Sequence, residues 1–137
     1  MRKLSLQLAI LAVLALVLSA CASSSSSLVS TQWTLTSLNG GDVSSASASI
    51  TIQFDLNGQV GGSAGCNSYG GSYSANADGG ITFSQIVSTL MACMDETVMN
   101  NEMAFLQALN GVNHYEISGE VLRLSDGDQQ LVFERSN

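Results

Sequence analysis

The sequence predicts an α+β domain in which about seven or eight short, mostly antiparallel strands form a curved or barrel-like sheet with one helix packed on it. Three observations support this prediction. From Trp33 onward, apolar and polar residues alternate in short runs, as in strands with one dry face. Glycine-rich turns separate those runs. Between Asp95 and Asn110, apolar residues instead recur every three or four positions, as on one face of a helix.

The first strands are expected around residues 33–35 and 50–56. In the second, four apolar residues alternate with polar ones and are predicted to share the buried face: Ile50, Ile52, Phe54 and Leu56. Asn57-Gly58 then predicts a type I′ hairpin turn. Residues 59–71 are unusually rich in glycine, which indicates bulges or close approach of backbones. Alternation resumes at Tyr69, Tyr73, Ile81 and Phe83, around a turn at residues 76–80.

The helical segment carries its apolar residues on one face: Val98, Met99, Met103, Phe105, Leu106 and Leu109. Asp95 or Thr97 is expected to cap its start and Gly111 its end. We expect its methionines to lie in the core, although a methionine stripe also suits an adaptable binding groove.

A three-stranded meander closes the chain, with alternation in residues 115–117, 122–124 and 131–133. Gly119-Glu120 suits a type II′ turn, and Asp126-Gly127 suits a type I′ turn.

Residues 1–20 are predicted to be an export signal. Arg2 and Lys3 precede an apolar run that is shorter than a membrane span and ends in small residues. Residues 18–21, Leu-Ser-Ala-Cys, resemble the lipobox of bacterial lipoproteins, which implies cleavage before Cys21 and lipid on its sulfur. Residues 21–29 are predicted to be the lipidated cysteine and a serine-rich tether that reaches only about 15 Å. The globular domain is expected at residues 30–137.

The predicted location is the cell envelope. By resemblance to other lipoproteins, Ala22 after the cysteine favours the outer membrane, facing the periplasm. Cleavage leaves Arg123 and Arg135 against eleven Asp and Glu, a formal charge of 2 − 11 = −9. Nucleic-acid binding needs a basic surface, so the charge excludes that class, whereas a cationic partner is compatible with it.

Three pieces of the sequence connect it with a known family. Gly65-Cys66-Asn67 with Tyr69, followed by Thr89-x-Met91-x-Cys93 and then by the helix with Glu102, Phe105 and Leu109, resembles the META domain of the HslJ-like lipoproteins. The likeness runs from about residue 33 to residue 133. The resemblance implies a compact β structure with one helix in an exported protein, linked in some members to heat shock, antibiotic resistance or motility. It implies no catalytic set and no cofactor.

Cys66 and Cys93 are an even pair in an exported domain and therefore candidates for a disulfide. Two unpaired buried thiols are the alternative, because sequence does not place their Cα atoms. A thiol hydrolase would use Cys66 as nucleophile, His114 as base and Asn67 as orienting group, but it requires a free thiol.

Other sites are poorly supported. Three Cys or His residues in the domain are too few for a structural zinc site, which wants about four. The acidic turns at residues 76–78 and 126–128 are too short for an EF-hand calcium loop. The glycine run at residues 61–65 lacks the Lys-Ser/Thr of a nucleotide-binding loop. No metal or nucleotide is therefore expected.

We expect a non-enzymatic, lipid-anchored envelope protein that supports envelope or stress resistance through protein or envelope contacts. The alternative is an acidic inhibitor or binder of a cationic exported protein, such as a lysozyme-like hydrolase.

Overall fold

The computed structural model describes residues 27–136, which form one curled antiparallel sheet of nine strands and one helix. The elements in chain order are β1 (Gln32–Leu38), β2 (Gly41–Asp42), β3 (Thr51–Phe54), β4 (Gln59–Ser63), β5 (Ser68–Ala75), β6 (Ile81–Ser88), α2 (Glu96–Gly111), β7 (His114–Ser118), β8 (Val121–Ser125) and β9 (Gln130–Arg135).

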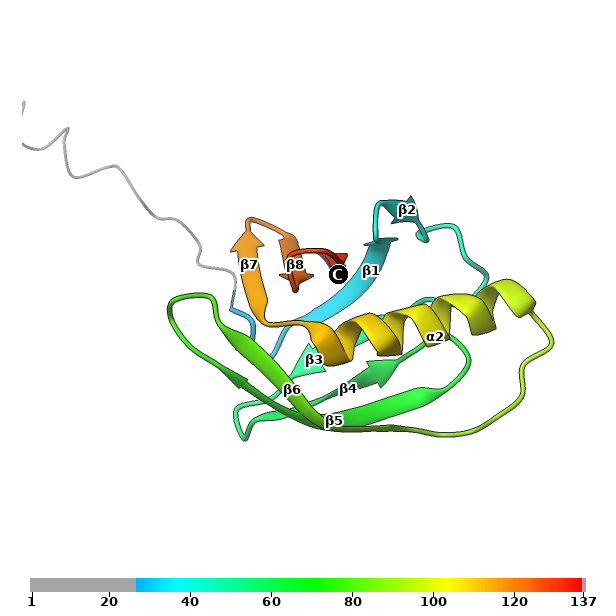
Figure 1. Cartoon of the computed structure of the whole chain (residues 1–137), viewed down its shortest axis with the longest axis horizontal. Helices are drawn as coiled ribbons and strands as arrows, with labels where there is room; N and C mark the ends of the chain where they lie inside the picture. The colour runs from blue at the N-terminus through cyan, green and yellow to red at the C-terminus, as the bar shows by residue number, and fades with distance from the viewer. Residues whose placement is uncertain (1–26, 137) are drawn as a thin grey trace, which may run out of the picture.

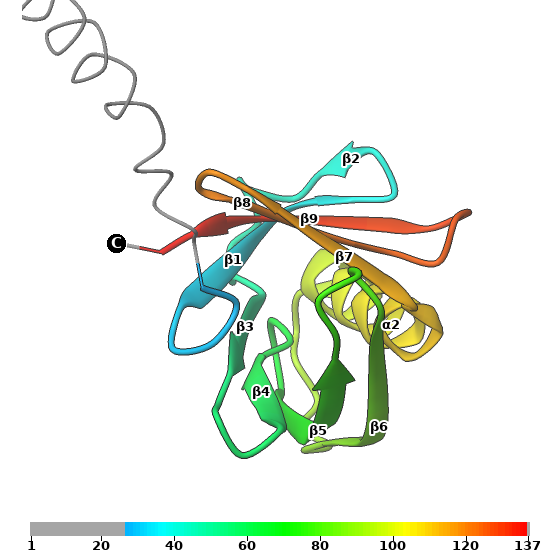
Figure 2. The same cartoon turned by 90° about the vertical axis from the view of Figure 1, so that its left-hand side faces the viewer.

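The sheet curls into a half-barrel whose open side is filled by the helix. Its strand order is β6-β5-β4-β3-β1-β9-β8-β7, with β2 paired to β1 at one end. The two outermost strands, β6 and β7, approach each other, and Gly80 and His114 form a bridge between their ends. α2 lies between these strands and covers the gap (Figures 1 and 2). The predicted α+β class with a curved sheet is confirmed.

The core occupies the space between the inner face of the sheet and α2. Its largest fully buried side chains are aromatic: Trp33, Phe54, Phe105 and Phe133. Phe105 brings the helix into this core, with its ring centroid 6.4 Å from that of Phe133 in an edge-to-face arrangement. The alternation that predicts the strands is therefore the pattern that fills the half-barrel.

The helix begins where its capping residue predicts. The Asp95 side chain accepts hydrogen bonds from the backbone N–H of Thr97 (2.9 Å) and of Val98 (3.2 Å). This bonding satisfies two of the N–H groups that a helix start leaves free. Asp95 is thus the cap, and Thr97 lies inside the helix.

The expectation that the helical methionines are core residues is wrong for Met103, which is 61% exposed. Val98, Phe105 and Leu109 form the buried stripe, while Met99 and Leu106 are partly buried beside it. One residue advances about 100° around a helix, so the neighbour of a buried residue faces sideways. Met103 follows the buried Glu102 and lies at the rim of the covered face.

The end of β3 and the turn that follows it also differ from the prediction. β3 ends at Phe54, so Leu56 is 86% exposed and does not share the buried face. Residues 55–58 connect β3 to β4 with positive φ at Gly58 (78°) and not at Asn57, so this is not a type I′ turn. Asp55 Oδ1 holds it by accepting from the N–H groups of Asn57 and Gln59, each at 2.8 Å.

The same solution recurs in the meander. Asp126 Oδ1 accepts from the N–H groups of Asp128 (3.0 Å) and Gln129 (2.7 Å), and only Gly127 has positive φ (103°), so the predicted type I′ turn is again wrong. Between β7 and β8, φ is positive at Gly119 (60°) and not at Glu120, as a type II′ turn requires. In the turns that begin at Asp55 and Asp126, the aspartate side chain bonds to the backbone of its own turn, and a wider turn replaces the predicted type I′ hairpin.

The glycine-rich stretch brings backbones close together, as expected. A Cβ atom at Gly62 would collide with the backbone carbonyl of Thr51 on β3. Gly65 has a φ of 111°, a conformation that favours glycine, and turns the chain after β4.

The globular domain begins before residue 30. Leu28 is buried, Val29 bridges to Phe54, and the indole N–H of Trp33 donates to the Leu28 carbonyl. Cys21 and the predicted signal peptide lie outside the described residues. Within residues 27–136, no helix has the length and apolar character needed to cross a membrane.

Candidate functional site

The family-motif residues meet at the loop between β4 and β5, where Asn67 is the centre of a hydrogen-bond network. Asn67 is 4% exposed. Its Oδ1 accepts from the Thr89 hydroxyl (2.8 Å) and from the Met91 N–H (2.7 Å). Its Nδ2 donates to the Met91 carbonyl (3.3 Å) and to Glu102 Oε1 (2.7 Å). Both acceptor and both donor positions of the amide are used.

Glu102 supplies the other half of this network from the buried face of α2. The side chain is 7% exposed. Its Oε2 accepts from the backbone N–H groups of Cys66 (3.1 Å) and Asn67 (2.7 Å). A buried carboxylate is costly unless it is hydrogen-bonded, and charged acceptors make stronger bonds than neutral ones. Glu102 therefore holds the 64–67 loop against the helix.

A disulfide joins Cys66 to Cys93, with Cα atoms 6.0 Å apart. This separation lies in the usual range for the bond. The disulfide and Asn67 together attach the segment between β6 and α2 at two neighbouring points, Met91 and Cys93.

Tyr69 connects the motif to the core. Its ring is 5% exposed and lies edge-to-face with Phe105, with centroids 5.3 Å apart. Its hydroxyl donates to the Thr51 carbonyl at 2.9 Å, and burial raises its pKa above the ordinary value. The tyrosine therefore stays neutral and structural across the physiological range.

The motif residues are thus held by one another rather than arranged around an open space. Glu102 belongs to the helical piece of the family resemblance, but the sequence analysis did not place it among the site residues. A signal was present, because Glu102 is an acidic residue at the helical spacing of the buried stripe, between Val98 and Phe105.

The structure does not assemble the thiol-hydrolase alternative. Cys66 is in the disulfide, and the Asn67 amide is bonded to Thr89, Met91 and Glu102. His114 is exposed at the start of β7, where its ring lies against Gly79 in the β5–β6 turn. Nucleophile, base and orienting group therefore do not form one site.

In the acidic turns, side-chain oxygens accept hydrogen bonds from the backbone N–H groups of the same turn. Asn76 Oδ1 accepts from the N–H groups of Asp78 (3.0 Å) and Gly80 (2.9 Å), in the same way as Asp126. Across residues 27–136, no three His, Cys, Asp or Glu side chains are grouped as metal ligands.

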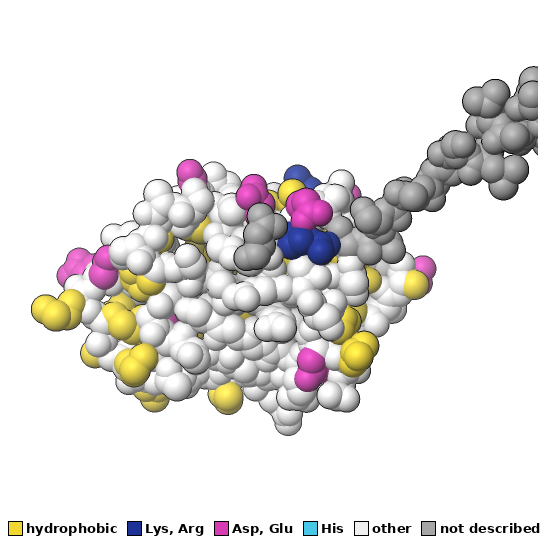
Figure 3. Space-filling model, turned by 180° about the vertical axis from the view of Figure 1, so that it is seen from behind, with side chains coloured by type: hydrophobic (Ala, Val, Ile, Leu, Met, Phe, Trp, Pro, Cys, Tyr) yellow, Lys and Arg dark blue, Asp and Glu magenta, His cyan; other side chains and the backbone are white. Residues whose placement is uncertain are grey.

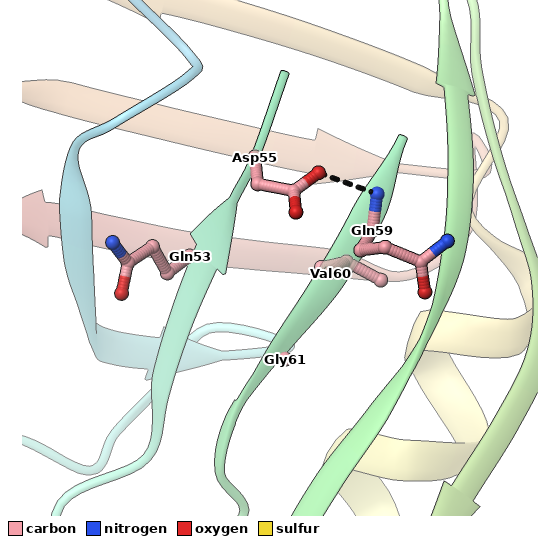
Figure 4. A pocket seen from close by; sticks show the side chains of 5 residues that line it. All are labelled: Gln53, Asp55, Gln59, Val60 and Gly61. Atoms are coloured by element: carbon pink, nitrogen blue, oxygen red, sulfur yellow. Dashed lines mark hydrogen bonds between the residues drawn. The ribbon is translucent and has the colours of Figure 1, made fainter. Parts of the chain in front are cut away.

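A shallow hollow of about 290 Å³ lies on the β3–β4 hairpin (Figure 4). It is lined by Gln53, Asp55, Gln59, Val60 and Gly61. The Asp55 carboxylate in it already accepts the Gln59 N–H, and both glutamines are exposed. The hollow therefore has no buried polar group directed at a ligand.

Comparisons with known proteins agree with this architecture. A protein from Burkholderia xenovorans with an NMR structure is similar at 30% identity and a TM-score of 0.67, over 80% of this chain and 84% of that one. A second NMR structure is similar in fold at 23% identity and a TM-score of 0.62, over 76% of this chain and 87% of that one. Curated proteins give no significant match. The META domain profile matches residues 26–137, and the chain therefore belongs to the META domain family.

Proposed function

We propose that the protein is a non-enzymatic, lipid-anchored component of the cell envelope that supports resistance to envelope stress through contacts with other proteins. One observation carries the proposal: the motif residues bond to one another. Asn67, Glu102 and the Cys66–Cys93 disulfide fix the shape of the domain, which is what a binding surface requires. The motif thus stabilises the fold around it rather than presenting reactive groups.

The location follows from the first residues of the sequence. The Leu-Ser-Ala-Cys segment at residues 18–21 provides the lipid attachment at Cys21, and two or more acyl chains anchor a protein stably. A serine-rich tether of about six residues would keep the domain close to its membrane. Contacts within the outer membrane or the periplasm are therefore the proposed mode of action.

Complementation of a deletion strain tests the proposal. Loss of the gene should increase sensitivity to heat, detergent and large antibiotics, and the wild-type gene should restore resistance. Cys21→Ala removes the lipid attachment and should fail to complement, whereas Ser24→Ala in the tether is the matched control and should complement fully. Unchanged sensitivity of the deletion strain, or full complementation by Cys21→Ala, would contradict the proposal.

The non-enzymatic part has its own test. His114 is the single histidine of the chain, and the proposal assigns it no chemistry. His114→Ala should complement like the wild type. A folded His114→Ala protein that fails to restore resistance would favour catalysis.

A further inference from the structure

Large apolar side chains lie in solvent along the segment that joins β6 to α2. Leu90 is 96% exposed, Met91 59% and Met94 102%. Met103, 61% exposed, adds a fourth from the side of the helix. We call Leu90, Met91, Met94 and Met103 the methionine patch. Clustered exposed apolar residues mark interaction surfaces more often than scattered ones do.

Asn67 connects the two elements that carry these side chains. The same amide nitrogen donates to the Met91 carbonyl and to Glu102, which precedes Met103 on α2. The segment between β6 and α2 runs along one end of the domain, at the right in Figure 1. The view from behind shows hydrophobic side chains gathered at this end, now at the left (Figure 3).

The segment that carries Leu90, Met91 and Met94 is held in a fixed form although it is neither helix nor strand. Met91 is bonded to Asn67 through both its N–H and its carbonyl, and Cys93 is tied to Cys66. Binding to a surface that is already ordered loses less conformational entropy. Methionine side chains, in turn, adapt to varied apolar partners. A rigid backbone with adaptable side chains is suited to docking.

The charged residues around the patch indicate which kind of partner would fit it. Asp95 and Glu96 follow Met94 directly and are exposed, so the rim of the patch is acidic. The arginines of the described residues, Arg123 and Arg135, lie on β8 and β9. Figure 3 shows acidic side chains beside the hydrophobic ones at this end, and the basic side chains away from it. A complementary face is therefore apolar at its centre and basic at its edge.

A membrane fits less well. The acidic rim is repelled by anionic lipid headgroups, which attract basic segments instead. The start of the described chain lies at the end of the domain opposite the segment between β6 and α2 (Figure 1). The segment that carries most of the patch is thus far from the start of the described chain.

We propose that the methionine patch is a docking surface for an apolar segment flanked by Lys or Arg on another exported protein. This inference rests on the proposed function and specifies which part of the domain makes the contact and what chemistry the partner presents.

The test uses the mature lipidated chain in nanodiscs of zwitterionic lipid, with a synthetic amphipathic peptide of leucines flanked by lysines as the probe. Met94→Ser and Leu90→Ser should each weaken peptide binding about tenfold, since central apolar anchors dominate interface energy. Leu56→Ser is the matched control, because Leu56 is 86% exposed on the β3–β4 turn. It should leave binding unchanged. A peptide with the same lysines and serines in place of leucines should bind at least tenfold more weakly.

Other outcomes overturn the inference. They are equal loss in Leu56→Ser and Met94→Ser, self-association that Met94→Ser abolishes, or binding to anionic vesicles that depends on the patch. Complementation separates this inference from the function it rests on. Patch variants that restore resistance like the wild type leave the proposed function intact and refute the docking surface. Folded patch variants that fail to restore it support both.

Discussion

The carboxylate of Glu102 is the acceptor on which the motif network depends, so its removal is the most informative perturbation. It accepts three hydrogen bonds, from the N–H groups of Cys66 and Asn67 and from the Asn67 amide. In Glu102→Ala all three donors lose their partner inside a buried region. In Glu102→Gln the shape is kept, but the new amide must point a donor at another donor.

The cost follows from the number of unpaired groups. A buried donor left without a partner costs about 1–3 kcal/mol. Relaxation and entry of water reduce the sum of three such terms, so we expect about 4 kcal/mol of destabilisation for Glu102→Ala. Glu102→Gln should cost about 2 kcal/mol, because one acceptor oxygen remains. Either loss is a large share of the total stability of a typical folded protein, which is roughly 5–15 kcal/mol.

Urea unfolding measures these losses. Trp33 is the single tryptophan and is fully buried, so its fluorescence reports loss of the core. With a slope of about 1.5 kcal/mol per molar urea, the midpoint should fall by about 2.7 M for Glu102→Ala and about 1.3 M for Glu102→Gln. Glu134→Gln, at an exposed carboxylate on β9, is the control and should change stability by less than about 0.5 kcal/mol. Wild-type stability in Glu102→Ala would refute the argument that the network holds the loop to the helix.

Three further predictions test other parts of the structure. The double variant Cys66→Ser, Cys93→Ser opens a link across 27 residues and should lose about 3.5 kcal/mol in urea unfolding, with the reduced wild type behaving alike. The pKa of Asp95 is lowered, first by a serine hydroxyl and then by backbone N–H groups, so its stabilisation is present above about pH 4 and lost as the pH falls through the folded-state pKa. Thermal unfolding of Asp95→Ala at a series of pH values should therefore show a shallower loss toward acid than the wild type, and identical curves would contradict this. Gly62→Ala places a methyl group against a β3 carbonyl and should cost about 2 kcal/mol, whereas Gly70→Ala meets only an ordinary contact and should cost clearly less.

The helix and most strands were well predicted because the patterns that indicate them involve only residues close together in the sequence. Period-two alternation placed most of the strands, although not β2 or the glycine-rich β4. The spacing of Val98, Phe105 and Leu109 placed the helix and its buried face. Asp95 marked the helix start because a cap needs only its next neighbours. Turn types were less predictable. The residue pair suggested the tight hairpin, but the side chains of Asp55 and Asp126 favoured a wider turn by bonding its backbone.

The candidate site required contacts that no local pattern contains. Spacing identified Cys66 and Cys93 as a pair, but whether they bond depends on the distance between their Cα atoms. Glu102 and Asn67 are 35 positions apart in the sequence. Helix periodicity alone marks Glu102 only as an acidic residue on the helix face that is expected to be buried. Exposure of Met103 was mispredicted for the same reason, because a residue beside the buried stripe is covered only if another element packs there.

The sequence by itself predicted the α+β class, most of the strands and the helix, the cap at the helix start and the acidic charge, because each depends on neighbouring residues or on composition. The cap at the helix end was mispredicted, since Gly111 is the last helical residue and Val112 follows it as the cap. It also predicted a lipid attachment at Cys21, which lies outside the described residues. Only the tertiary structure decided that the motif is an internal network centred on Asn67 and Glu102, and that the chain around Met91 and Met94 is left exposed at one end. These properties depend on how the sheet curls and which segments the helix meets, and that is set by packing of the whole core.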